Sequence, residues 1–125
     1  MNTFAWLVLG HLLGDWVLQN DWMAKGKRRQ LLGMAGLVHA AGYALTILGA
    51  CWFSGCRGRQ PTFYLALGGA IFLSHWLIDG TRLVERWMRL YRQTDLPVVR
   101  LMVDQTLHVV VLVASMVLMS TGYEK

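Results

Sequence analysis

Four apolar stretches of near-membrane length leave this chain few ways to fold. They cover residues 4–23, 31–53, 62–83 and 98–120, and each is close to the ~20 residues that a helix needs to cross the hydrocarbon core. Hydrophobic residues make up 55% of the chain and charged residues only 15%, against roughly 25% charged residues in an average soluble domain. The sequence therefore predicts an all-α fold, a four-transmembrane-helix bundle that forms one integral-membrane domain over residues 1–125.

The basic residues lie mainly between the apolar stretches. By the positive-inside rule the two most basic connectors face the cytoplasm, which predicts a multi-pass protein of the bacterial inner membrane with both termini outside. The net charge of +5 then reflects loops that face anionic lipid headgroups, so we expect no nucleic-acid partner. The basic residues are Lys25, Lys27, Arg28 and Arg29 in the first connector, Arg57 and Arg59 in the second, Arg82, Arg86, Arg89, Arg92 and Arg100 in the third, and Lys125 in the tail.

Every histidine of the chain lies inside an apolar stretch, one in each stretch. Three of them have an aspartate four residues away, on the same helix face. A single pair of this kind is most often a hydrogen-bonded couple that stabilises a bundle, but ionisable groups inside a membrane are costly and are functional-site candidates by default. Three pairs and a further histidine favour one shared site. The pairs are His11 with Asp15, His75 with Asp79 and Asp104 with His108, and His39 stands alone.

These polar groups are expected at a common depth. Counted from the cytoplasmic end of each predicted span at 1.5 Å per residue, they lie roughly 6–18 Å below the cytoplasmic surface. All seven side chains can therefore line one chamber. By the same count Cys51 and Cys56 lie at the outer end of the second stretch, too far away to take part. A disulfide between them is chemically permitted there but not required.

Four imidazoles and three carboxylates need a group that offsets the cost of their burial, about 2.5–3.5 kcal/mol for one carboxylate at the centre of a membrane helix. A divalent metal is one candidate, because imidazole and carboxylate suit zinc, iron and manganese. Seven donors are enough for one or two ions, and Gln19 and Gln105 can add contacts. The predicted metal ligands are His11, Asp15, His39, His75, Asp79, Asp104 and His108.

The two halves of the chain also resemble each other. His11 and Asp15 recur as His75 and Asp79, and the histidines of the second and fourth stretches correspond. This pattern suggests two helical hairpins related by a pseudo-twofold axis along the membrane normal, as in some transporters. The repeat is imperfect, because the second stretch has Ala35 where an acidic residue would be needed.

The chain is similar to the small bacterial and phage membrane proteins that are grouped as domain of unknown function 3307. The similarity covers nearly the whole chain. It implies that these residues form one site, and it implies nothing about a substrate, because the family has no established activity. It is carried by HLLGDWVLQNDW from His11, by His39, by HWLIDGTR from His75 and by DQTLH from Asp104.

These observations favour a metal-dependent hydrolase that acts on a lipid or another membrane-associated substrate. Membrane-bound metal-dependent hydrolases also place histidines and aspartates in several spans, which is an analogy of architecture alone. The ion would activate a water molecule. Arg82 is placed to bind a phosphate headgroup. The general base would be whichever carboxylate stays outside the coordination shell, chosen from Asp15, Asp79 and Asp104.

Two other functional classes stay open. One is a non-enzymatic membrane module whose metal or polar core holds the helices together for a partner membrane protein or for a homo-oligomer. The other is a metal or proton carrier, which uses the same residue types but usually needs polar groups on both sides of the membrane. Elemental analysis of the purified protein separates a metal site from a purely polar core.

Overall fold

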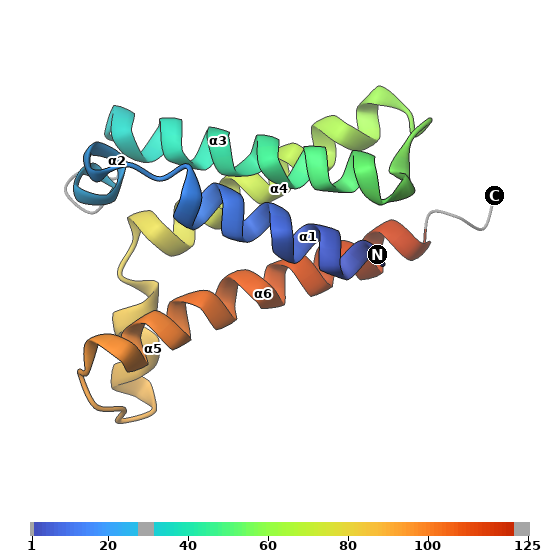
Figure 1. Ribbon diagram of the computed structural model, residues 1–125. Helices are drawn as coiled ribbons and strands as arrows, with labels where there is room; N and C mark the ends of the chain where they lie inside the picture. The colour runs from blue at the N-terminus through green and yellow to red at the C-terminus, as the bar shows by residue number, and fades with distance from the viewer. Residues whose placement is uncertain (1, 28–31, 122–125) are drawn as a thin grey trace.

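The computed structural model describes residues 2–27 and 32–121, and every regular element in these ranges is helical. The predicted all-α class is thus confirmed. In Figure 1, α1, α3, α4 and α6 form the bundle, with α2 and α5 at one end of it. Arg28, Arg29, Lys125 and the start of the second stretch lie outside the described residues. The elements are α1 (Thr3–Leu12), the π-helical η1 (Leu13–Val17), α2 (Asp21–Gly26), α3 (Met34–Cys51), the π-helical η2 (Trp52–Cys56), α4 (Pro61–Gly80), α5 (Leu83–Leu90) and α6 (Pro97–Thr121).

The first apolar stretch is not one membrane-length helix. α1 and η1 form an apolar helix that ends at Val17, and its length is only about 22 Å, short of the ~30 Å of the hydrocarbon core. The chain then leaves the helix, because Asn20 caps α2: its side-chain oxygen accepts a hydrogen bond from the Met23 backbone N–H at 3.0 Å. The prediction of one continuous membrane-length helix over residues 4–23 is therefore wrong.

Three helices in the described part of the chain are long and apolar enough to cross a membrane: Met34–Cys56, Pro61–Gly80 and Pro97–Val117. They match the other three predicted stretches, except that α4 ends earlier, because Thr81 has an extended backbone (φ −106°, ψ 174°). Three helices of sufficient length and hydropathy, not clearly four, suggest that the chain is associated with a membrane. The short α1 also makes the two halves unequal, and their pseudo-twofold relation stays a prediction.

The core contains one fully buried residue from each of the four bundle helices. These are Leu7, Ile47, Ile71 and Leu112. α1 lies close against α3 because two glycines present no side chain there. An added Cβ would come within 2.9 Å of Ala50 Cβ at Gly10, and within 2.5 Å of Thr46 Oγ1 at Gly14. This close approach holds η1 against α3, and η1 carries the first aspartate of the site.

Gly14→Ala is expected to destabilise the protein by about 1–3 kcal/mol, because the new methyl group would overlap Thr46 Oγ1 and press on the Tyr43 ring. Gly69→Ala on α4 is the matched control, since nothing lies within 4 Å of its added Cβ. Thermal unfolding of both variants in detergent measures the difference. Equal unfolding midpoints would show that α1 does not pack this tightly on α3.

Candidate metal centre

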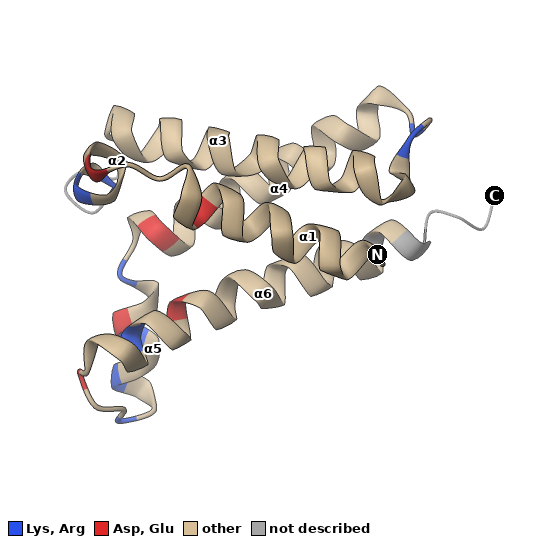
Figure 2. Cartoon of the chain, viewed as in Figure 1, with Lys and Arg blue, Asp and Glu red and all other residues tan. Residues whose placement is uncertain are grey.

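The seven predicted side chains gather at the end of the bundle that carries α2 and α5. Figure 2 shows acidic residues of η1, α4 and α6 at this end. The seven side chains come from α1, η1, α3, α4 and α6, so segments from both halves of the chain contribute to the cluster. Asp79 has a side chain that is 5% exposed, and Asp104 is partly buried. The remaining five are at most 3% exposed: His11, Asp15, His39, His75 and His108.

Four of these residues form a first group, in which one ligand atom from each lies within 4.8 Å of the others: Asp15, His39, His75 and Asp79. His39 Nε2 lies 2.9 Å from His75 Nε2 and 3.2 Å from Asp79 Oδ2. Asp15 Oδ1 lies 3.3 Å from His39 Nε2 and 3.9 Å from His75 Nε2. Neighbouring ligands of an ion bound at about 2.0–2.2 Å lie roughly 3.0–3.6 Å apart. Two of these four separations lie in that range and the other two within about 0.3 Å of it, so the group could hold a metal ion.

Asp15 also belongs to a second group, with Asp104 and His108, whose ligand atoms lie within 4.8 Å of one another. His108 Nδ1–H donates to the Asp104 backbone carbonyl at 2.9 Å, which leaves a lone pair on Nε2 of the neutral ring. That Nε2 lies 3.6 Å from Asp79 Oδ1. A ring nitrogen and a carboxylate oxygen thus face each other, and a cation bound beside them could contact both.

Unpartnered polar atoms give independent support for a cation. Four buried side-chain atoms of the described residues have no hydrogen-bond partner: Asp15 Oδ1, His108 Nε2, Gln19 Oε1 and His75 Nδ1. Leaving such an atom unsatisfied costs about 1–3 kcal/mol. The first two atoms face the groups described above, so a metal ion bound there would satisfy both. The donor set of imidazole and carboxylate suits zinc, iron or manganese.

His11 lies beside the two groups and belongs to neither. Its Nε2–H donates to Gln105 Oε1 at 2.9 Å, so Nδ1 of the neutral ring accepts from the Tyr43 hydroxyl at 3.0 Å. Gln105 in turn donates from Nε2 to Asp15 Oδ2 at 3.0 Å. His11 and Asp15 are therefore linked through one amide. The predicted role of His11 as a metal ligand stays a prediction, and both its ring nitrogens already have other partners.

The position of Asp15 depends on the π-helical turn of η1. The Leu18 N–H donates to the Leu13 carbonyl at 2.9 Å, five residues back instead of four. Such single π turns occur frequently at functional sites. Asp15 lies in this wider turn, whereas His11 lies in the regular helix that precedes it. Asp15 reaches His39 on α3.

Two residues of the site were not predicted. Lys27 Nζ lies 2.6 Å from Asp79 Oδ2 and 3.7 Å from Asp15 Oδ1, and its side chain is only 11% exposed. Nothing in the sequence distinguishes Lys27 from the other basic residues of its connector. The Tyr43 ring stacks on His75, with centroids 3.7 Å apart. Tyr43 follows the solitary histidine of α3 by one helical turn, a spacing that could have identified it.

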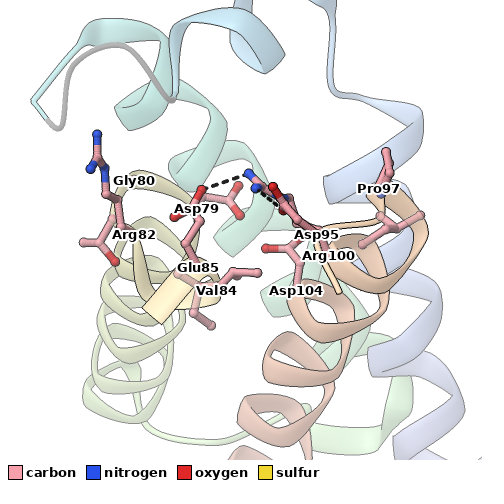
Figure 3. A pocket seen from close by; sticks show the side chains of 12 residues that line it. Asp79, Gly80, Arg82, Val84, Glu85, Asp95, Pro97, Arg100 and Asp104 are labelled. Atoms are coloured by element: carbon pink, nitrogen blue, oxygen red, sulfur yellow. Dashed lines mark hydrogen bonds and ion pairs between the residues drawn. The ribbon is translucent and has the colours of Figure 1, made fainter. Parts of the chain in front are cut away.

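A pocket of about 830 Å³ opens beside Asp79 and Asp104. Figure 3 shows its lining from the end of α4, from α5 and from the start of α6, with dashed lines for ion pairs. Arg100 lies at this pocket, 3.0 Å from Glu85 Oε1 and 2.8 Å from Asp95 Oδ1. The other lining arginine, Arg82, is exposed and has no ion pair within the described ranges. The pocket thus places two arginines and four carboxylates next to the His/Asp cluster: Arg82, Arg100, Asp79, Glu85, Asp95 and Asp104.

The profile of one protein family, described as Protein of unknown function (DUF3307), matches residues 3–124. This match confirms the resemblance inferred from the histidine and aspartate motifs, and all residues of the site lie within it. No curated protein and no solved structure matches the chain.

Proposed function

The chain belongs to the family DUF3307, whose function is unknown, and we propose that it is a metal-dependent membrane hydrolase acting on a phosphate-bearing lipid. The observation that carries this proposal is the position of Asp79 and Asp104. Each belongs to one of the two His/Asp groups, and both line the pocket of about 830 Å³. A scissile bond held in that pocket would lie next to a bound ion.

Asp15, His39, His75 and Asp79 would hold the ion. Four protein ligands close a tetrahedral zinc site, whereas a six-coordinate manganese or iron ion keeps two positions open for water and substrate. A divalent ion supplies Lewis-acid chemistry there and makes a water molecule nucleophilic at neutral pH. We therefore expect manganese or iron in the enzyme.

Asp104 is the proposed general base. It lines the pocket, and one of its oxygens, Oδ2, accepts a hydrogen bond from Gln105 Nε2 at 3.3 Å. The same nitrogen donates to Asp15, so one amide orients a ligand and the base together. The other oxygen of Asp104 is left to accept a proton from a water molecule in the pocket.

In the proposed hydrolase, Arg82 at the pocket would bind the anionic headgroup, and the apolar residues of the lining would contact the lipid tail. The guanidinium of Arg82 can bind phosphate with two parallel hydrogen bonds, and Ile78, Val84 and Leu101 supply apolar walls. Membrane lipids are therefore the proposed partners. We place this end of the bundle at the cytoplasmic face of the inner membrane, with both termini outside, because the two most basic connectors lie here.

Elemental analysis followed by turnover assays tests this proposal. The purified protein is expected to contain about one manganese or iron ion per chain and to turn over phospholipids or isoprenoid phosphates in vesicles. Asp104→Asn should keep the ion and lose at least about 100-fold in rate. A protein that binds no metal, or Asp104→Asn at full rate, would refute it.

Arg82→Ala is expected to raise KM for a phosphate-bearing substrate about tenfold or more, because it removes a lining guanidinium that has no ion pair among the described residues. The metal content should not change. Arg86→Ala is the matched control, since Arg86 is an exposed arginine of α5 that does not line the pocket. Steady-state kinetics compares the two variants, and equal KM values would exclude Arg82 as the phosphate ligand.

Lys27 favours a second candidate, a non-enzymatic membrane module with a structural polar core. Its ammonium group lies 2.6 Å from Asp79 Oδ2 and already offsets one carboxylate charge. The two groups would then stabilise the bundle for a partner protein or for a second copy of the chain. Zinc in the closed four-residue shell, or no metal at all, combined with no turnover, would favour this candidate.

A further inference from the structure

Three sulfur atoms meet at the end of the bundle opposite the His/Asp cluster. Cys51 Sγ and Cys56 Sγ lie 3.6 and 3.9 Å from Met119 Sδ, and each of these residues is at most 5% exposed. In Figure 1, the end of α3, η2 and the end of α6 lie together, away from α2 and α5. None of the three residues takes part in the proposed hydrolase.

The backbone of η2 places the second cysteine near the first. Gly55 has a φ of 113°, which residues with a side chain rarely adopt, and the chain leaves the helix after Cys56. The Ser54 hydroxyl donates to the Cys51 carbonyl at 2.8 Å and satisfies an acceptor of the helix end. Met119 comes from α6, so the three sulfurs are brought together from two separate segments.

A positive side chain lies beside the sulfurs. The Arg59 guanidinium donates to the Met119 backbone carbonyl at 3.0 Å and lies 5.0 Å from the centre of the Phe63 ring. Two thiolates that bind a monovalent cation form a complex with one net negative charge. Arg59 is positioned to balance that charge, because cationic neighbours stabilise thiolates.

We propose that Cys51, Cys56 and Met119 form a binding site for copper(I). Thiolate and thioether sulfurs are soft ligands that select this ion. Three sulfurs around an ion at about 2.3 Å would lie about 4 Å apart, close to both separations from Met119 Sδ. Binding releases the two thiol protons and changes no oxidation state. Without metal, the same residues pack as part of the apolar core.

Anaerobic titration of the full-length protein with copper(I), in competition with a chromophoric chelator, tests this site. Cys51→Ser and Cys56→Ser should each lower the affinity at least about 100-fold. Met119→Leu, which nearly conserves volume, should lower it about tenfold. Met102→Leu is the matched control, since Met102 is an exposed methionine of the same helix. Asp79→Asn should leave copper(I) binding unchanged, which separates this site from the His/Asp cluster.

X-ray absorption spectroscopy keeps the proposal testable even if the serine variants do not fold. We expect three sulfur neighbours at about 2.3 Å from copper in the native protein, and two in Met119→Leu. Nitrogen or oxygen neighbours alone would overturn the proposal. It would also be overturned by an affinity that Met119→Leu leaves unchanged, or by a Cys51–Cys56 disulfide that persists in the reducing conditions of the titration.

Discussion

Asp79→Asn is expected to leave the purified protein without bound metal and without activity. Asp79 reaches both parts of the cluster: Oδ2 lies 3.2 Å from His39 Nε2 and 3.3 Å from His75 Nε2, and Oδ1 lies 3.6 Å from His108 Nε2. An amide keeps the size of the side chain but not its charge, so the metal affinity should fall at least about 100-fold. Metal per chain is measured by mass spectrometry after acid digestion.

Asp95→Asn is the matched control for this experiment. Asp95 lines the same pocket and pairs with Arg100, but its side chain is 80% exposed and it lies outside both His/Asp groups. Metal content and turnover should therefore stay at the level of the unmodified protein. Equal metal content in the two variants would contradict the assignment of Asp79 as a ligand. It would also contradict the proposed hydrolase function.

The effect of Lys27→Met on stability is expected to depend on whether metal is bound, and this dependence separates the two proposed functions. Without metal, Asp15 and Asp79 would lose the ammonium group that lies 3.7 and 2.6 Å from their oxygens. Breaking a buried ion pair in this way costs about 3–5 kcal/mol. With metal bound, the ion holds both carboxylates. The substitution should then cost little stability, and it should tighten metal binding by removing a like charge. Unfolding in detergent with and without a chelator measures both cases.

Lys25→Met controls for the loss of a basic residue in the same segment. Lys25 pairs with Asp21 at 2.9 Å on an exposed surface, where their side chains are 72% and 91% exposed. Such pairs contribute little to stability. Should Lys27→Met be equally destabilised with and without the chelator, the polar core would be supported and the metal centre contradicted.

Hydropathy predicted the long helices well. α3, α4 and α6 follow three of the apolar stretches, because a contiguous run of apolar residues favours a helix wherever it is buried or faces lipid. Hydropathy failed for the first stretch, where the N-cap residue Asn20 starts a new helix at Asp21. A hydropathy average over the whole stretch does not register one capping residue.

The spacing of histidines and aspartates predicted the site in part. His75 and Asp79 lie on the uninterrupted helix α4, and their ligand atoms are 3.3 Å apart, as a four-residue spacing requires. His11 and Asp15 have the same spacing but flank the start of the π turn, so they reach different partners. Regular periodicity holds only where the helix is regular.

Composition and periodicity are properties of single segments, and they settled which parts of this chain are helical and which side chains are polar within them. Which atoms then meet depends on how closely the helices approach and on where flexible side chains end. Gly14 lets η1 approach α3, and Lys27 extends from a connector to two buried carboxylates. Contacts of this kind join residues distant in the chain, and their energies depend on packing and burial, which no local pattern contains.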